Sequence, residues 1–253
     1  MTVFHGTPCG GDRAGVAKFL ANRDALVPFL RPEDLGVSLE VCRSVILDNS
    51  AFSAWRSGDP IVDWRPYYEW VETVRRHPRF AWAIVPDVID GSESDNDKLW
   101  GEWPLELNQV GVVVWHLHES LRRLERIVFC ATNSTNRICL GSSGEYATPN
   151  TPAWRRRMRQ AMKVICDPEG RPRVHVHGLR MAASDIRKRY PFASVDSTNA
   201  VQNAGSLGRF GMYAPPTKWQ RAAVIADRME TDRSPAVFDF ADADQQVFEL
   251  SAT

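Results

Sequence analysis

Short apolar runs, each followed directly by polar residues, recur along this chain of 253 residues. The runs are rich in valine and isoleucine and lack interior charge, which is typical of parallel strands buried on both faces. They predict seven strands, at Ala25–Phe29, Val45–Leu47, Phe80–Val85, Val110–Trp115, Arg137–Leu140, Arg173–Val176 and Phe192–Val195.

Helical stretches lie between several of these runs, and a last one follows them. They are Trp64–Arg76, Glu119–Phe129, Trp154–Ile165, Ser184–Tyr190 and Lys218–Met229. Alternating strands and helices indicate a parallel sheet. With 43% hydrophobic residues, the chain can bury the core of one large domain, and (β/α)8 barrels run near this length. We therefore expect a single-domain TIM-like barrel over residues 1–230 and an acidic extension over 231–253. A doubly wound open sheet is the alternative.

Net charge and cysteine content indicate which partners and which cellular compartment to expect. The formal net charge is +0, so no global field attracts the chain to nucleic acid or membrane, and any polyanion contact must be local. The five cysteines form no CxxC pair and are odd in number, as expected of reduced thiols. We expect a cytoplasmic protein. The oligomeric state stays open, a homo-oligomer included.

A polar cluster follows six of the predicted strands. The clusters are Asp48-Asn49-Ser50, Pro86-Asp87, His116-Leu117-His118, Gly141-Ser142-Ser143-Gly144, His177-Gly178 and Asp196-Ser197-Thr198. In a parallel barrel all these strand ends open onto one face, where barrel enzymes carry their active sites. Each acidic or hydroxyl residue has an alternative role as the N-cap of the next helix. That alternative is weaker for Asp48 and Asp196, because other polar residues follow them.

Histidines in these clusters leave a metal site open. His116 and His118 share a strand face if the strand continues through them, as do His175 and His177. With Asp196 they would form a metal-dependent barrel hydrolase. A third alternative is a barrel that only binds nucleic acid or a partner protein.

The order of the clusters resembles that of a known family. The sequence Asp48-Asn49-Ser50-Ala51-Phe52, then Pro86-Asp87-Val88, Gly141-Ser142-Ser143-Gly144-Glu145, His177-Gly178-Leu179 and Val195-Asp196-Ser197-Thr198-Asn199 is similar to the tRNA-guanine transglycosylase superfamily. The closest likeness is to its phage and bacterial branch, the DNA-guanine transglycosylases. The likeness covers about residues 45 to 200, and the opening His5-Gly6-Thr7-Pro8 also resembles that branch.

This resemblance implies a (β/α)-barrel that replaces guanine in a polynucleotide by a 7-deazaguanine, such as the 7-cyano form. It implies that Asp196 is the nucleophile that attacks the anomeric carbon, and that Asp48 is the general acid and base. Retaining glycoside hydrolysis divides two carboxyl groups in the same way. The expected partners are DNA and the free 7-deazaguanine base, with no cofactor.

The resemblance also implies contacts to the base. Asp87 would bind its guanine-type edge, and the backbone near Gly141 would contact the ring. His116 falls where the tRNA enzymes have a glutamine. Phe52 and Trp115 are candidates to stack on the base, although core positions in the barrel explain both. The predicted substrate-binding residues are Asp87, His116, Gly141, Ser142, Phe52 and His177.

The sequence departs from the tRNA enzymes in two ways. The first departure favours the DNA branch or a divergent function, and the motifs alone leave an RNA substrate open. Those enzymes carry a zinc-binding cysteine cluster with a histidine near the C-terminus, whereas Cys166 is the last cysteine here. We therefore expect neither the zinc nor its subdomain. The first motif reads Asp-Asn-Ser-Ala-Phe instead of Asp-Ser-Gly-Gly-Phe.

Local runs of arginine are candidates for binding phosphate. They are Arg155, Arg156 and Arg157, which open the helix after the Gly141–Glu145 segment, and Arg180 with Arg187-Lys188-Arg189. A solvated helix face is the alternative for such a charge run.

Overall fold

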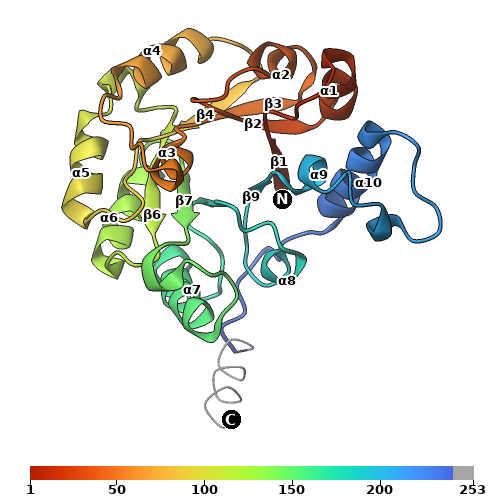
Figure 1. Cartoon of the computed structure of the whole chain (residues 1–253). Coiled ribbons are helices and arrows are strands. Elements are labelled where there is room, and N and C mark those ends of the chain that lie inside the picture. The colour runs from red at the N-terminus through yellow and green to blue at the C-terminus, as the bar shows by residue number, and fades with distance from the viewer. Residues whose placement is uncertain (242–253) are drawn as a thin grey trace.

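The structure of the protein is a computed structural model, and it describes residues 1–241. Nine strands form one all-parallel sheet in the order β5-β4-β3-β2-β1-β9-β8-β7-β6 (Figure 1). They are β1 Thr2–Gly6, β2 Asp24–Pro28, β3 Ser44–Asp48, β4 Phe80–Ile84, β5 Gly111–Val112, β6 Val114–His116, β7 Arg137–Gly141, β8 His175–Gly178 and β9 Ser194–Ser197. Only Val113 separates β5 from β6, the two ends of this order. The sheet therefore curls into a nearly closed, TIM-like barrel.

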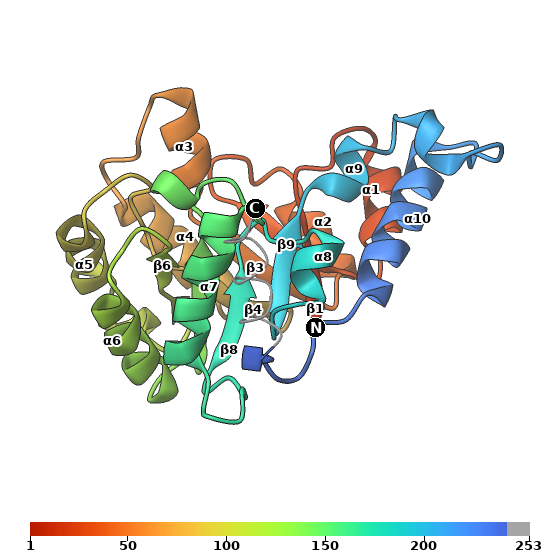
Figure 2. The same cartoon turned by 90° about the horizontal axis from the view of Figure 1, so that it is seen from below.

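Helices lie around the outside of the sheet (Figures 1 and 2). They are α1 Arg13–Leu20, α2 Leu35–Val41, α3 Ala51–Ser57, α4 Arg65–Val74, α5 Glu93–Glu102, α6 Leu121–Thr132, α7 Pro152–Ile165, α8 Ser184–Arg187, α9 Asn199–Gln202 and α10 Lys218–Thr231, with 3₁₀ turns η1 Leu105–Leu107, η2 Gly144–Tyr146 and η3 Leu207–Phe210. Several begin at a side-chain cap: Thr151 accepts from the N–H of Trp154, and Pro152 opens α7. Such caps satisfy N–H groups that have no partner within the helix.

Side chains alternate between the two faces of each strand. One set packs against the helices and forms the larger core, for example Val3, Val45, Leu140 and Val195. The other set points into the barrel and forms a second, separate cluster: Phe4, Leu26, Ile46, Trp82, Ile84, Val112, Val114 and Cys139. This inner layer fills the barrel, so the polar residues at the strand ends lie above an apolar floor.

The same alternation places the polar strand ends over that floor. Asp48 comes two residues after Ile46, and His116 two residues after Val114, so both continue the inward face. Asp196 lies opposite Phe4 in the register of β9 and β1. Figure 2 shows α3 and α9, the helices after β3 and β9, at the same end of the molecule.

The predicted strands all overlap observed ones, with three differences. The predicted strand Val110–Trp115 is interrupted at Val113, and β1 was not predicted. The predicted starts of β8 and β9 were wrong by two residues. Before β8, Cys166 and Pro172 form an antiparallel bridge, and the N–H of Arg173 donates to Ile165 in that hairpin. Before β9, the N–H of Phe192 donates to Tyr190 in a tight turn, so the strand starts at Ser194.

The helix predictions were right in place but incomplete. All five predicted helices exist, although Ser184–Tyr190 is too long, since α8 ends at Arg187. The unpredicted helices are α1, α2, α3, α5 and α9. In the part of the chain that the structure describes, no helix is long and apolar enough to cross a membrane.

The predicted acidic extension begins where α10 ends. The buried ring of Phe238 stacks on Tyr190 with centroids 5.7 Å apart, and its N–H donates to Gly170. This segment is therefore packed against the barrel as far as Phe238. Residues 242–253, with most of the predicted acidic stretch, lie outside the described residues.

Candidate active site

Three carboxyl groups meet at the C-terminal end of the barrel. Asp48 ends β3, Asp87 follows β4, and Asp196 lies in β9. Burial, and then the negative charges of Asp196 and Asp87, raise the pKa of Asp48 to about 7. The N–H of Ser50 and the guanidinium of Arg180 act in the opposite direction. Asp48 therefore holds or releases a proton near neutral pH, as a general acid and base requires.

Asp196 lies in a different environment. The backbone N–H of Arg180 donates to its Oδ1 at 2.8 Å, and Nε2 of His177 lies 3.4 Å from the same oxygen. Oδ2 receives no hydrogen bond from any residue between 1 and 241. One oxygen is thus held in place while the other is available for reaction.

His177 supports Asp196 from within the barrel. It pairs with Ser194 in the register of β8 and β9, one inward layer below Asp196, and its Nδ1 lies 2.9 Å from the Ser194 hydroxyl. The ring is fully buried against Phe4 and Trp82, and burial lowers its pKa. The ring contacts Asp196 and has no solvent-accessible surface, and its direct contact with a substrate stays a prediction.

Asp87 is held from both sides. Nδ2 of Asn49 donates to its Oδ1 at 2.7 Å, and Nε2 of His116 lies 2.7 Å from its Oδ2. Asn49 also donates to the Val85 carbonyl. These contacts fix the carboxylate plane, and each oxygen keeps capacity to accept another hydrogen bond. Asn49 directly follows Asp48, so one strand end supplies both a carboxyl group and the residue that orients another.

A network of buried side chains fixes the backbone at His116 and next to Asp87. Glu119 accepts from the His116 N–H at 2.9 Å, from Asn96 at 2.9 Å and from Arg123 at 2.6 Å. Asn96 in turn binds both the N–H and the carbonyl of Val88, next to Asp87. Glu119 and Arg123 can both be buried because each charge is paired with the other and also forms hydrogen bonds to its neighbours.

Two glycines let the strand ends approach closely. A Cβ at Gly141 would lie 2.9 Å from Nδ1 of His116, its neighbour in the register of β6 and β7. A Cβ at Gly6 would lie 2.6 Å from the Thr198 side chain, just beyond Asp196. Any side chain at Gly141 would push His116 away from Asp87, and the predicted contact of the Gly141 backbone with a base stays a prediction.

Phe52 lies under a guanidinium. The Cζ atom of Arg180 is 3.5 Å from the centre of the Phe52 ring, which places the two groups in direct stacking contact. Arg180 has a left-handed φ of 58° and comes from the segment after β8, whereas Phe52 is in α3 after β3. The pair thus joins segments that follow the Asp48 strand and the strand beside Asp196.

Both serine hydroxyl groups of the Gly141–Glu145 segment contact other side chains of the protein. The Ser142 hydroxyl accepts from Nε1 of Trp154 at 2.9 Å, and the Ser143 hydroxyl lies 2.7 Å from Nδ1 of His118. His118 also contacts the Gly91 carbonyl and stacks on His116 with centroids 5.8 Å apart. These contacts hold the segment against the loop after β4.

The predicted arginine contacts differ in their surroundings. Arg157 donates to the carbonyls of Leu117 and Glu119, and Arg155 donates to Asn150 at 2.9 Å. Both therefore stabilise loops of the barrel. Arg156 forms no hydrogen bond or ion pair with another residue between 1 and 241. Trp115 is fully buried in the outer core, which is the alternative that the sequence left open for it beside stacking on a base.

The predicted histidine cluster is spread along the barrel. His175, the first residue of β8, is exposed, whereas His177 is buried. Across residues 1–241, no group of three or more His, Cys, Asp or Glu side chains is placed to hold a metal ion. The metal-dependent hydrolase stays a prediction, which elemental analysis of the purified protein would check.

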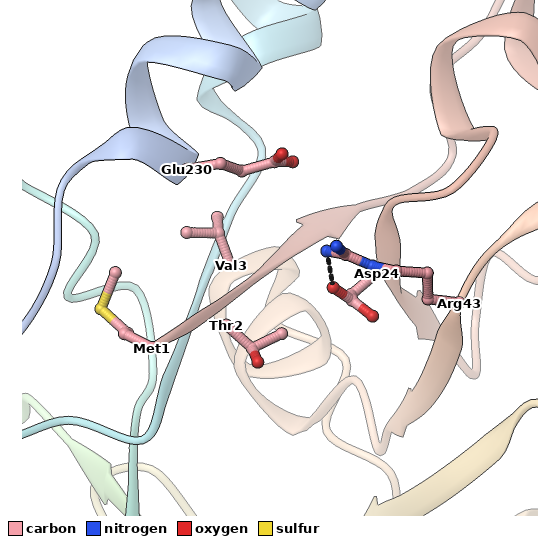
Figure 3. A pocket seen from close by; sticks show the side chains of 6 residues that line it. All are labelled: Met1, Thr2, Val3, Asp24, Arg43 and Glu230. Carbon is pink, nitrogen blue, oxygen red and sulfur yellow. Dashed lines mark hydrogen bonds and ion pairs between the residues drawn. The ribbon is translucent and has the colours of Figure 1, made fainter.

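A separate cavity of about 370 Å³ lies at the opposite end of the barrel (Figure 3). It is lined by Met1, Thr2, Val3, Asp24, Arg43 and Glu230. Its charged groups are paired, Asp24 with Arg43 and Glu230 with His5 and Arg23. Contacts at this end of a barrel usually serve stability.

Sequence reasoning missed the supporting residues Ser194, Asn96 and Arg123, and did not assign a role to Asn49 or Glu119. The signal for Asn49 was its place between Asp48 and Ser50, in a strand-end cluster. Asn96 and Arg123 lie within helices, so only the tertiary fold relates them to the site. In comparisons with protein families, curated proteins and solved structures, no match to this chain was found.

Proposed function

We propose that this protein is a base-exchange enzyme that replaces guanine in DNA by a 7-deazaguanine through a covalent intermediate on Asp196. The observation that carries the proposal is the contrast between two nearby carboxyl groups. The pKa of Asp48 is raised to about 7, while Asp196 is held by a backbone N–H with one oxygen available. Glycosyl transfer by double displacement needs such a pair, one group as nucleophile and one as proton carrier.

The reaction follows from these roles. Oδ2 of Asp196 forms a bond to C1′ of the target nucleotide as the C1′–N9 bond breaks. The bonding electrons leave with guanine, and protonated Asp48 supplies the proton that neutralises the departing base. The incoming 7-deazaguanine then gives a proton to the Asp48 carboxylate. Its N9 bonds to C1′ as the ester to Asp196 breaks, which restores both carboxyl groups.

Recognition of the base is assigned to Asp87. Guanine and 7-deazaguanine share N1–H and an exocyclic amine, two adjacent donors that suit one carboxylate. Because Asn49 and His116 orient Asp87, its remaining lone pairs are fixed in direction. Phe52 would stack on the base after the Arg180 guanidinium moves aside. A duplex target must be flipped out, and a single strand would enter directly.

The barrel suits this activity as a single (β/α)8 unit. If β5 and β6 are counted as one strand interrupted at Val113, the nine strands become eight. We propose that this unit acts without the zinc-binding subdomain of the tRNA enzymes, and that DNA binds over the C-terminal end of the strands.

Incorporation of a labelled base tests the proposal. The protein is incubated with DNA and labelled guanine or 7-cyano-7-deazaguanine, and the DNA is digested to nucleosides. We expect label in the deoxynucleoside fraction with the native chain and none with Asp196→Ala, whose fold is checked by circular dichroism. A native chain that incorporates none of the bases tested into DNA or RNA would refute the proposed activity.

A further inference from the structure

A second cavity, of about 460 Å³, lies between the segments that follow β8 and β9 and the C-terminal half of α10, and Asp48, Asp87 and Asp196 are not among the residues that line it. It is bounded by α8, α9, α10 and the 3₁₀ turn η3, which gather on one side of the barrel in Figure 1. The polar residues that line it are Ser184, Arg187, Asn199, Arg209, Arg228 and Asp232.

The charges of this cavity are unbalanced. It contains three guanidinium groups and one carboxylate. Asp232 is already engaged by the Ser184 hydroxyl at 2.7 Å, by Arg187 at 3.1 Å and by Lys188 at 3.4 Å. Arg209 and Arg228 are exposed, and within residues 1–241 neither forms an ion pair. Two positive charges therefore face the cavity without a partner.

Arg187 supplies a further unused donor. Its side chain is 3% exposed, and its two terminal nitrogens donate to the Met229 carbonyl and to Asp232. Its Nε is buried without a hydrogen-bond acceptor in the described part of the chain. A buried N–H of a charged group without an acceptor is costly, and Arg187 is one of the residues that line the cavity, so an anion that reached its Nε would offset that cost.

The walls of the cavity come from the segments that hold Asp196. Asn199 is three residues after Asp196, and Ala183 is three residues after Arg180, whose N–H binds Asp196. The side-chain amide of Asn199 has only the sulfur of Met229, 3.7 Å away, as its described acceptor. A ligand in the cavity would thus lie close along the chain to the proposed nucleophile.

We propose that this cavity binds a backbone phosphate of the DNA strand whose nucleotide reaches Asp196. The inference rests on the proposed function and adds the place where the protein holds the DNA strand. Planar guanidinium groups match the geometry of phosphate oxygens, and Arg209 and Arg228 need no existing ion pair to be broken. Barrel enzymes commonly bind phosphate at the loops after their last strands, and α9 follows the last strand here.

Oligonucleotide binding by charge-deleted variants tests the proposal. The variants are Arg209→Ala, Arg228→Ala and the double variant, since both residues are exposed and their loss should leave the fold intact. Arg187 is kept, because its removal would leave the Met229 carbonyl without that donor. The matched control is Arg122→Ala, an exposed arginine of α6 on another side of the barrel.

The probe is a fluorescent single-stranded DNA with one guanine, measured by anisotropy over a range of salt concentrations. For the double variant we expect Kd to rise on the order of tenfold. The slope of log K against log salt should become less negative by roughly 0.7, the value for one phosphate contact on a single strand. Arg122→Ala should match the native chain in both quantities.

An unchanged Kd and salt slope in the double variant would overturn the proposal. Inorganic phosphate provides a second arm. If phosphate raises the Tm of the native chain but not of the double variant, while both bind DNA equally, the cavity takes free phosphate and the strand assignment is wrong. Failure of the base-exchange reaction is separable: arginine-dependent DNA binding without incorporation would refute the exchange activity and retain the phosphate site.

Discussion

The backbone N–H of Arg180 donates a 2.8 Å hydrogen bond to Oδ1 of Asp196. The same residue places its guanidinium 3.5 Å above the Phe52 ring and lowers the pKa of Asp48 through its charge. Arg180 therefore orients one proposed catalytic carboxyl group by its backbone and tunes the other by its side chain. A variant that changes only the Arg180 side chain therefore alters the charge near Asp48 and leaves the backbone hydrogen bond to Asp196 in place.

The pH dependence of base exchange should show the state of Asp48. The free enzyme must carry a proton on Asp48 to release guanine, and the pKa of this group is raised to about 7. We expect kcat/KM to fall above an apparent pKa of about 7. Initial rates from pH 5 to pH 9 measure this limb, and a profile that stays flat to pH 9 would contradict the assignment.

Removal of the Arg180 charge should shift the alkaline limb of the pH profile of kcat/KM. Arg180→Gln keeps the backbone N–H but deletes a positive charge that holds the pKa of Asp48 down. We expect the alkaline limb to move to higher pH. Phe52→Ala is the matched control, because it removes the stacking contact and leaves the charge. A limb that moves equally in both variants would argue against the electrostatic role.

The stability of the fold should depend on pH through Asp48. Its pKa is raised from 3.8 to about 7 in the folded chain, so between these values only the unfolded chain is ionised there. The free energy of unfolding therefore falls as pH rises through that window. Asp48→Asn should be more stable than the native chain at pH 8, on the order of a few kcal/mol, since one pKa unit is about 1.4 kcal/mol.

Urea denaturation at two pH values measures this difference. At pH 3 both chains are neutral at position 48, so the gain of Asp48→Asn should vanish. An equal gain at pH 3 and pH 8 would mean that the substitution acts through packing instead of ionisation.

The close contact at Gly141 should matter for base recognition. In Gly141→Ala the new Cβ would lie 2.9 Å from Nδ1 of His116 and displace the ring from Asp87. We expect affinity for free guanine to fall by roughly tenfold, which corresponds to the loss of one charged hydrogen bond. Gly101→Ala, where a Cβ meets nothing within 4 Å, is the control. Calorimetric titration would give equal affinities for both variants if His116 does not support Asp87.

The buried pair behind His116 should be needed for stability. In Glu119→Gln, Arg123 keeps its charge but loses a buried carboxylate partner. We expect a loss of about 3 kcal/mol in the free energy of unfolding. Glu125→Gln, at an exposed position of α6, the helix of Arg123, should change it by less than about 0.5 kcal/mol. Comparable losses in the two variants would show that Glu119 has no special structural role.

Alternation and strand-end position were enough to predict much of the fold. Asp48 and His116 were expected at the open end of the barrel because each follows a short apolar run, and the structure places both there. β1 was missed, since Thr2–Gly6 is a short stretch with a histidine and no preceding element to set the alternation. The break at Val113 depends on how β4 and β7 pair with their neighbours, which no local pattern encodes.

How deeply a side chain lies within the barrel was harder to predict than which face of its strand it occupies. His175 and His177 share a face, but the register of β8 and β9 leaves the first exposed and buries the second below Asp196. The raised pKa of Asp48 was also beyond the sequence, because it depends on burial and on charges from β4 and β9. Such quantities follow from distances between segments far apart in the chain.

The central claim is a covalent bond between the DNA and Asp196, and mass spectrometry of the protein's peptides tests it most directly. The protein is mixed with guanine-containing DNA without an acceptor base, quenched in acid and digested with protease. The account predicts a nucleotide adduct on the peptide that contains Asp196, and none with Asp196→Asn. An adduct on the peptide of Asp48, or full base exchange by Asp196→Asn, would contradict it.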